Sequence, residues 1–308
     1  MAGRSRPMMT LWAARAFLGL ICLLVALYLG LSAYMTTIAT VATRRPVVGT
    51  PTDVGLAFEP VIMQTADRLA LKGWLLPSSP ERAVIMVHGL DVNRWDNGQG
   101  WHEVTKAYIE SGFTVLLFDL RAHGESGGDR LGLGWDERQD VLAGVAFLRN
   151  RGFKPGRIGL YGASYGAGTA LLAAAQAPEV GAVVADSPYA DQREILSREI
   201  TRRTGFPPIF APGIALMARP LLGLDLAGIP PLLAVSQIAP RPILFIHGEA
   251  DARIPYQNSE RLIAAANNPI NELWIVKGAA HADSYSLLKD DYTNRIVGFF
   301  GRYLRDAQ

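Results

Sequence analysis

Short apolar runs alternate with amphipathic segments along the chain after residue 57. Continuous apolar runs are typical of strands covered on both faces of a sheet, and apolar residues every three or four positions are typical of helices. The predicted strands are 58–65, 69–76, 83–87, 114–118, 158–161, 182–185, 243–246 and 273–276, and the predicted helices include 101–111, 135–149, 257–266 and 287–304. This alternation predicts an α/β fold with a mainly parallel central sheet and helices on both faces.

The N-terminus has a different pattern, because residues 16–43 contain no charge. Such a run is long enough to cross the ~30 Å core of a bilayer as a helix. Five arginines flank it, at positions 4, 6, 15, 44 and 45. Their slight excess on the N-terminal side favours a cytoplasmic N-terminus and an extracytoplasmic remainder. We therefore expect residues 1–45 to form a tail and an uncleaved, single-pass signal anchor. A cleaved signal peptide is the alternative.

Two further boundaries follow from composition. Residues 46–57 are rich in Pro, Gly and Thr, which is typical of a linker, and we expect one domain over 58–308. More than fifty residues, about 187–240, separate two predicted strands, which is too long for an ordinary loop and predicts a helical lid. One interpretation is that this lid lines an apolar acyl pocket that faces the bilayer. The other is a packed cap that completes the core.

Composition excludes several classes of function. The 308 residues carry a net charge of +2 with dispersed basic residues, so the chain lacks the basic stripe of nucleic-acid-binding proteins. Cys22 is the only cysteine, which excludes an intrachain disulfide. The five histidines show no metal-binding spacing, so we expect neither a metal nor a cofactor.

The segment 157–177 has the strongest functional signal. An apolar strand leads into Gly162-Ala163-Ser164-Tyr165-Gly166, and an Ala- and Leu-rich helix follows. The pattern G-x-S-x-G between a strand and a helix predicts a sharp, strained turn that exposes the serine hydroxyl. Glycine is expected at both ends of the motif because a Cβ would clash with neighbouring backbone. A Gly-rich turn with a bystander serine is the alternative interpretation.

The chain resembles the α/β-hydrolase fold family over residues 58–304. The resemblance rests on HGL at 88–90, DLRAHGES at 119–126, GASYG at 162–166, FIHGEADARIP at 245–255 and GAAH at 278–281. Within this family the sequence is most similar to membrane-anchored BEM46-like or serine-aminopeptidase-like hydrolases. The resemblance implies an α/β-hydrolase fold with the chain order Ser, Asp, His for a catalytic triad.

The expected site residues all follow predicted strands. Ser164 would be the nucleophile, His281 its general base, and Asp251 the acid that orients the imidazole. The backbone N–H groups of Leu90 and Tyr165 would form the oxyanion hole. Asp186 also ends a strand and is the rival for the acid. We expect the other histidines, at 88, 102, 123 and 247, to have structural roles and not catalytic ones.

We therefore predict a membrane-anchored serine hydrolase that cleaves carboxylic esters or thioesters of a small-molecule substrate, with a lipophilic acyl group if the lid faces the bilayer. Amide chemistry, as in aminopeptidases or acylpeptide hydrolases, uses the same triad and remains an alternative. A catalytically silent binding protein on this fold is an alternative of another class.

Overall fold

The computed structural model describes residues 6–226 and 228–304. The remaining positions belong to the predicted N-terminal tail, the insertion and the end of the predicted domain, and they lie outside the described residues. The chain forms two compact units. One contains the N-terminal segment up to Thr40 together with Leu196–Asp225, and the other contains Val41–Ile195 and the chain from Leu226 onward.

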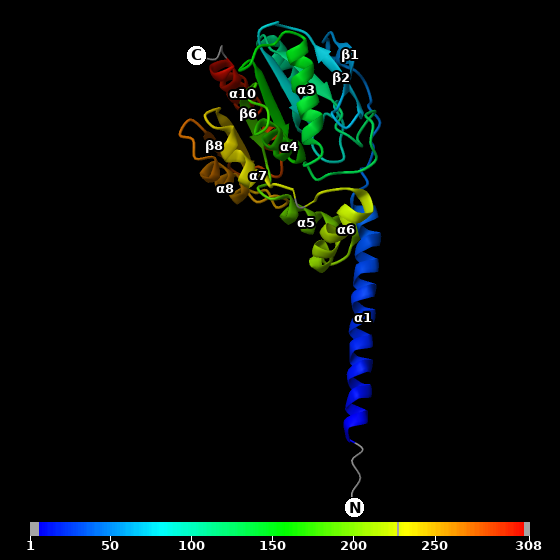
Figure 1. Ribbon diagram of the computed structural model, residues 1–308. Helices are drawn as coiled ribbons and strands as arrows, with labels where there is room; N and C mark the ends of the chain where they lie inside the picture. The colour runs from blue at the N-terminus through cyan, green and yellow to red at the C-terminus, as the bar shows by residue number, and fades with distance from the viewer. Residues whose placement is uncertain (1–5, 227, 305–308) are drawn as a thin grey trace, which may run out of the picture. The chain divides into compact units, whose positions relative to one another are not determined.

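The second unit is built on an eight-stranded sheet (Figure 1). Its strands are β1 (Glu59–Gln64), β2 (Ala70–Leu76), β3 (Ala83–Val87), β4 (Thr114–Phe118), β5 (Ile158–Ala163), β6 (Val180–Asp186), β7 (Ile243–Gly248) and β8 (Glu272–Val276). Their spatial order is β1-β2-β4-β3-β5-β6-β7-β8. The hairpin β1–β2 and the pair β2–β4 are antiparallel, and every other pair is parallel. The predicted, mainly parallel sheet is confirmed.

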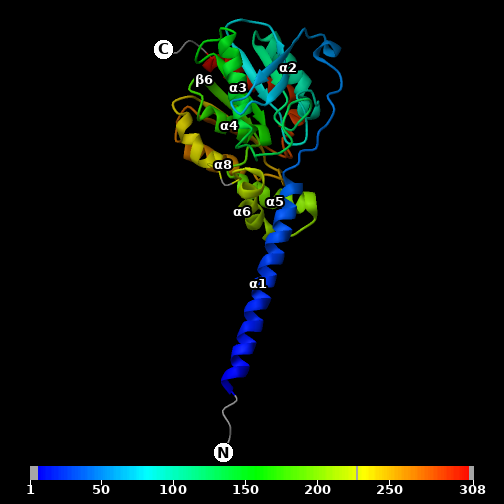
Figure 2. The same ribbon diagram turned by 45° about the vertical axis from the view of Figure 1, so that its right-hand side comes forward.

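Helices cover both faces of this sheet, as predicted (Figure 2). The helices of this unit are α2 (Trp101–Glu110), α3 (Arg138–Asn150), α4 (Tyr165–Ala174), α7 (Pro231–Ala234), α8 (Gln257–Ala266), α9 (Ser284–Leu287) and α10 (Lys289–Tyr303), with short 3-10 turns η1 (Pro51–Val54), η2 (Gly98–Gly100) and η4 (Val235–Ile238). Apolar residues of α3, α4 and α8 form the core on one face, and those of α2 and α10 form the core on the other. Strands β3 to β7 are buried nearly throughout and apolar without alternation because both faces are covered, whereas the edge strand β1 alternates between buried and exposed residues.

Helix α3 begins at Arg138, three residues later than the periodicity predicts. The Glu137 carboxylate accepts hydrogen bonds from the N–H groups of Gly132 and Gly134, both at 2.8 Å. These bonds hold the preceding residues in a turn and fix the start of the helix.

The first unit contains the N-terminal helix α1 (Arg6–Ala39), the 3-10 turn η3 (Pro208–Phe210) and α6 (Ala211–Leu222). The chain passes from one unit to the other within α5 (Gln192–Thr204). The insertion between β6 and β7 is therefore helical, as predicted. Among the described residues, α1 is the one helix long and apolar enough to cross a membrane, over Leu11–Ala39.

Candidate active site

Ser164 occupies a strained turn between β5 and α4. Its backbone has φ 55° and ψ −117°, a conformation that residues with a side chain rarely adopt. A Cβ on Gly162 would lie 2.4 Å from the carbonyl oxygen of Gly166, and a Cβ on Gly166 would lie 2.0 Å from that of Val87. Both glycines are required by close backbone approach, as the motif predicts. The turn places the serine hydroxyl at the carboxyl edge of the sheet, where ligands of such folds bind.

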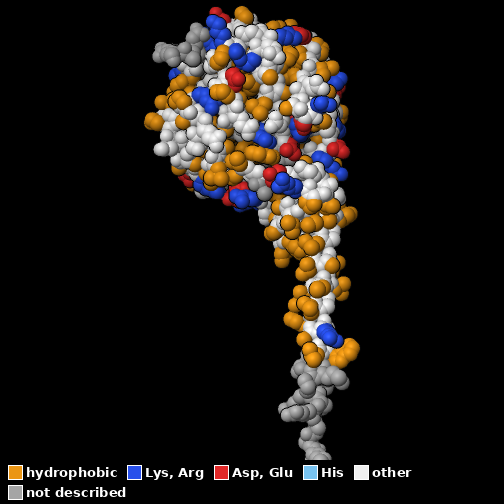
Figure 3. Space-filling view, viewed as in Figure 1, with side chains coloured by type: hydrophobic (Ala, Val, Ile, Leu, Met, Phe, Trp, Pro, Cys, Tyr) orange, Lys and Arg blue, Asp and Glu red, His pale blue; other side chains and the backbone are white. Residues whose placement is uncertain are grey.

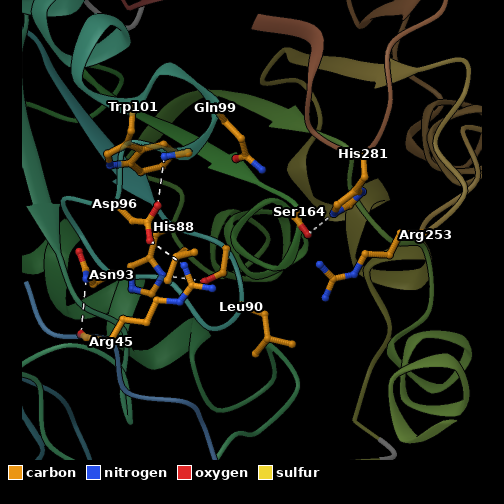
Figure 4. A pocket seen from close by; sticks show the side chains of 13 residues that line it. Arg45, His88, Leu90, Asn93, Asp96, Gln99, Trp101, Ser164, Arg253 and His281 are labelled. Atoms are coloured by element: carbon orange, nitrogen blue, oxygen red, sulfur yellow. Dashed lines mark hydrogen bonds and ion pairs between the residues drawn. The ribbon is translucent and has the colours of Figure 1, made fainter. Parts of the chain in front are cut away.

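Three side chains from distant parts of the chain meet at this edge, and Figure 4 shows two of them, Ser164 and His281. The hydroxyl oxygen of Ser164 lies 2.7 Å from Nε2 of His281, and Nδ1 of His281 lies 2.7 Å from Oδ2 of Asp251. His281 follows β8, and Asp251 follows β7. If Nδ1 carries the proton that the carboxylate accepts, Nε2 is left as the acceptor for the serine proton. The arrangement can therefore remove a proton from the hydroxyl.

The Asp251 carboxylate is held by donors on both oxygens. Oδ1 accepts hydrogen bonds from the backbone N–H groups of Arg253 and Ile254, at 2.9 and 2.8 Å. Oδ2 lies 3.2 Å from Nε2 of His247 as well as 2.7 Å from His281. Burial disfavours the charged form, but the hydrogen bonds from the two histidines, with the nearby charge of His281, hold the pKa of Asp251 below its ordinary value. Asp251 therefore stays ionised beside the imidazole.

His247 is buried and has a partner on each ring nitrogen. Its Nε2 lies 2.7 Å from the carbonyl oxygen of Ile254, and its Nδ1 lies 2.7 Å from the hydroxyl of Ser259. A hydrogen on Nε2 can serve both the Ile254 carbonyl and Asp251, while Ser259 donates to Nδ1. The ring thus fixes both the loop after β7 and the orientation of the carboxylate.

Asp186, the rival acid, faces a different set of partners. Its carboxylate accepts hydrogen bonds from the Tyr292 hydroxyl at 2.7 Å and the Ser187 hydroxyl at 3.0 Å. Burial raises the pKa of Asp186, against the effect of these hydrogen bonds. The Ser187 hydroxyl also accepts the N–H of Ala282 at 3.0 Å. Asp186 and Ser187 therefore support the loop that carries His281 instead of contacting its ring.

The predicted oxyanion donors belong to the residue after the serine and to the loop after β3. Tyr165 is the first residue of α4, so its N–H has no acceptor within the helix. Leu90 lies on the loop after β3, in the lining of the same cavity as Ser164. His88 shapes this loop: its Nδ1 pairs with the carbonyl of Gly89 at 2.7 Å, and its Nε2 accepts the N–H of Leu120 at 3.0 Å. Burial, with a contribution from His123, lowers the pKa of His88 to about 3, so the ring is neutral.

A cavity of about 200 Å³ opens beside Ser164 and His281. The other side chains that line it are largely polar. The polar ones are Arg45, His88, Asn93, Asp96, Gln99 and Arg253, and the apolar ones are Leu90, Val92 and Trp101. Arg45 forms an ion pair with Asp96 at 3.1 Å. No local pattern in the sequence marks these polar lining residues, except that His88 begins the HGL motif and Arg253 lies two residues after Asp251.

Within the described part of the chain, no cluster of three or more His, Cys, Asp or Glu side chains could hold a metal ion. The site consists instead of a serine in a strained turn, an imidazole and a buried carboxylate, on a sheet of the observed order. The fold together with this turn defines the molecule as an α/β-hydrolase.

Comparison with known proteins gives the family. The chain is 31% identical to YqkD of Bacillus subtilis over 235 residues, covering 74% of each protein. It is 30% identical to YfhR of Escherichia coli K12 over 251 residues, covering 78% of this chain and 80% of that protein. The chain belongs to the α/β-hydrolase family that contains these two proteins. Residues 64–207 also match the X-Pro dipeptidyl-peptidase (S15 family).

Among solved structures, the chain is similar to the esterase Pf2001 of Pyrococcus furiosus. The TM-score is 0.71 at 27% sequence identity, and the match covers 86% of this chain and 99% of the esterase. The likeness therefore extends over nearly the whole of the esterase.

Proposed function

We propose that this protein is a serine hydrolase that cleaves carboxylic esters or thioesters through an acyl-enzyme intermediate. The observation that carries the proposal is the continuous hydrogen-bonded chain from Ser164 through His281 to Asp251, with 2.7 Å at each link. Similarity to a solved esterase supports it. The catalytic domain is the segment 58–308, which resembles the membrane-anchored BEM46-like and serine-aminopeptidase-like hydrolases in its motifs.

In the proposed mechanism, Nε2 of His281 takes the proton of the Ser164 hydroxyl as the oxygen attacks the acyl carbon. The new C–O bond places negative charge on the former carbonyl oxygen. The N–H groups of Leu90 and Tyr165 stabilise this charge. His281 then gives its proton to the departing alcohol or thiol. A water molecule then loses a proton to the same ring as its oxygen attacks the acyl carbon. The bond to the Ser164 oxygen breaks, the ring returns the proton to that oxygen, and the acid leaves.

Asp251 acts through His281. Because the carboxylate is ionised and held by donors on both oxygens, it keeps the proton on Nδ1 and stabilises the imidazolium that forms during attack. Asp186 has no such role in this proposal, since its carboxylate serves Tyr292 and Ser187.

The size and lining of the cavity suggest the substrate class. About 200 Å³ is small beside pockets for drug-sized ligands, which measure roughly 300–1,000 Å³. We therefore expect a short acyl group, with polar groups of the substrate near Gln99 and Arg253. An apolar acyl pocket for a long chain, as the lid interpretation suggested, has less support in this lining.

Amide hydrolysis is the second candidate, and the match to the X-Pro dipeptidyl-peptidase family over 64–207 favours it. The same three side chains can serve both reactions, since the leaving group alone differs. Only the relative rates on ester and amide substrates separate the two.

We further propose that α1 is a retained signal anchor, with a cytoplasmic N-terminus and an extracytoplasmic catalytic domain. The support is the length and apolar character of Leu11–Ala39 and the flanking arginines. A reporter enzyme fused to either end, active on only one side of the membrane, tests this topology.

The function is tested with the purified full-length chain in mild detergent. The substrates are p-nitrophenyl acetate, butyrate and decanoate, an acyl thioester, and a p-nitroanilide of an Xaa-Pro dipeptide. We expect the short esters to be cleaved fastest and the Ser164→Ala variant to lose at least ~10³-fold in rate. Faster cleavage of the anilide would favour the peptidase. Undiminished hydrolysis by Ser164→Ala would refute the mechanism.

A further inference from the structure

Helix α1 does not stand alone in its unit, because the segment 206–222, here called the cap segment, packs against its C-terminal part (Figure 1). The Tyr28 hydroxyl donates a hydrogen bond to the carbonyl of Ile209 at 3.0 Å and accepts one from the N–H of Gly213 at 3.1 Å. The Tyr28 ring stacks on Phe210 with 5.5 Å between centroids. A tyrosine within an apolar helix thus has both of its hydrogen-bonding functions and its ring engaged by the cap segment.

The two elements approach closely along a strip of small residues. A Cβ on Gly213 would lie 2.2 Å from the hydroxyl oxygen of Ser32. The Thr36 hydroxyl lies 3.3 Å from the carbonyl of Ile214, and Ser32, Met35 and Thr36 are buried. Close contact through Gly, Ser and Thr is the way helices associate inside membranes, where burying apolar side chains gives no driving force.

The position of this contact along α1 decides where the cap segment lies relative to a bilayer. Side chains over 11–27 are exposed, and burial begins after them. A span of about 20 residues that starts at Ala16, the first position after Arg15, ends near Met35. The stretch from Tyr28 to Met35 is about 10 Å of helix. The contact with the cap segment therefore falls within the last third of the hydrocarbon layer.

The outward surface of the cap segment is also apolar. The exposed fractions are 66% for Ile209, 61% for Leu216 and 50% for Leu221. Arg219 is the single charged residue of 206–222, and a long arginine side chain can reach the headgroups from a helix at the interface. Figure 3 shows hydrophobic side chains gathered over both α1 and the segment beside its C-terminal end.

We propose that the cap segment is a second membrane-contacting element, seated in the outer leaflet against α1 with Ile209, Leu216 and Leu221 in contact with lipid. The occupant of this apolar surface is the bilayer itself, because the surface is continuous with that of the spanning helix. The proposal rests on the proposed anchor. It also requires that α1 be retained, since cleavage would leave the carbonyl of Ile209 and the N–H of Gly213 without the Tyr28 hydroxyl.

The test places a polarity-sensitive fluorophore at single cysteines of the full-length chain in phosphatidylcholine nanodiscs. The only native cysteine, Cys22, lies exposed on α1 and serves as the reference for a membrane position. In the Cys22→Ser background, Leu216→Cys reports on the cap segment. Ile62→Cys on β1 is the matched control, because its side chain is also apolar and 66% exposed.

Quenching by doxyl-labelled lipid and by aqueous iodide gives the readout. We expect the fluorophore at position 216 to behave like the one at Cys22. Compared with position 62, quenching by doxyl lipid should be at least about threefold stronger and quenching by iodide should be weaker, as for a helix buried ~5–10 Å at the interface. A Leu216 position as open to iodide as Ile62 overturns the proposal. Strong quenching by iodide at Cys22 also overturns the proposal, because it would show that α1 does not lie in the membrane.

Hydrolysis of p-nitrophenyl acetate by the same labelled proteins separates this proposal from the catalytic one. Neither Leu216 nor Ile62 belongs to the catalytic machinery, so turnover should stay within about twofold of the parent. If turnover is normal and position 216 is exposed to water, the proposed membrane contact is refuted and the proposed catalytic function is not. If the unlabelled parent protein does not hydrolyse the ester, the proposed function is refuted. The quenching result still tests membrane contact, because it does not depend on turnover.

Discussion

The closest backbone approach at the proposed nucleophile yields a quantitative prediction for Gly166→Ala. The added methyl would lie 2.0 Å from the carbonyl oxygen of Val87 and 2.5 Å from that of His88. Ordinary contacts of this kind need more than 3 Å, so α4 and the end of β3 must separate by about 1 Å. Overpacking of a buried site costs ~1–3 kcal/mol. Because both partners are buried backbone, we expect the upper end, ~3 kcal/mol.

The matched control is Gly298→Ala in α10. A Cβ there meets no atom within 4 Å, and the position is exposed in the middle of a helix. Alanine should stabilise this helix by about 0.5–1 kcal/mol, because it is the better helix former. The same substitution is thus predicted to act in opposite directions at the two glycines.

Thermal unfolding followed by circular dichroism measures both variants. A loss of ~3 kcal/mol lowers Tm by roughly 6–12 °C in a domain of this size, and the control should raise it by a few degrees. Gly166→Ala should also lose roughly 10²-fold in ester hydrolysis, because the loop it displaces carries the proposed donor Leu90. A Gly166→Ala variant that melts with the wild type and keeps full activity would refute the close approach.

Three further predictions concern residues around the proposed active site. Asp251→Asn should lower kcat by ~10³–10⁴-fold, whereas Asp186→Asn should keep kcat within about tenfold and mainly lower Tm; the reverse pattern would transfer the acid role. His247→Leu should lower kcat by roughly tenfold with little change in KM, since leucine cannot donate a hydrogen bond to Asp251; an unchanged kcat would show that His247 serves only the loop after β7. His88 should stay neutral in imidazole NMR spectra from pH 7.5 to 5, because burial lowers its pKa to about 3. The unfolded state binds that proton near pH 6.5, so the unfolding free energy should fall by up to ~1.4 kcal/mol per pH unit as the pH drops from about 6.5 toward 3. A ring that titrates near 6.5 would contradict this.

The sequence allowed most of the sheet to be predicted, because strands covered on both faces are continuous apolar runs. The run 83–87 coincides with β3, and the strand ends at 163, 248 and 276 carry the expected site residues shortly after them. The G-x-S-x-G turn could be predicted equally well, because the close approach of neighbouring backbone requires glycine at both ends of the motif. The catalytic roles of Ser164, Asp251 and His281 stay predictions.

Other features had no local signal. Helix α6 could not be predicted from the sequence, because Pro212 and Pro220 interrupt its helical periodicity. Pro212 lies in the first turn of the helix, where proline is tolerated. The hydrogen bond from Gly213 of this helix to Tyr28 joins residues 185 positions apart, which periodicity cannot reveal. The polar cavity lining likewise comes from several loops that meet only in the folded chain. Long-range contacts of this kind depend on the whole topology.

The most direct test of the central claim is covalent labelling of the full-length protein with a fluorophosphonate, followed by mass spectrometry of the peptides. We expect one adduct, on Ser164, that is absent from Ser164→Ala and strongly reduced in an equally folded His281→Ala variant. A folded protein that does not react, or an adduct on another residue, would contradict it.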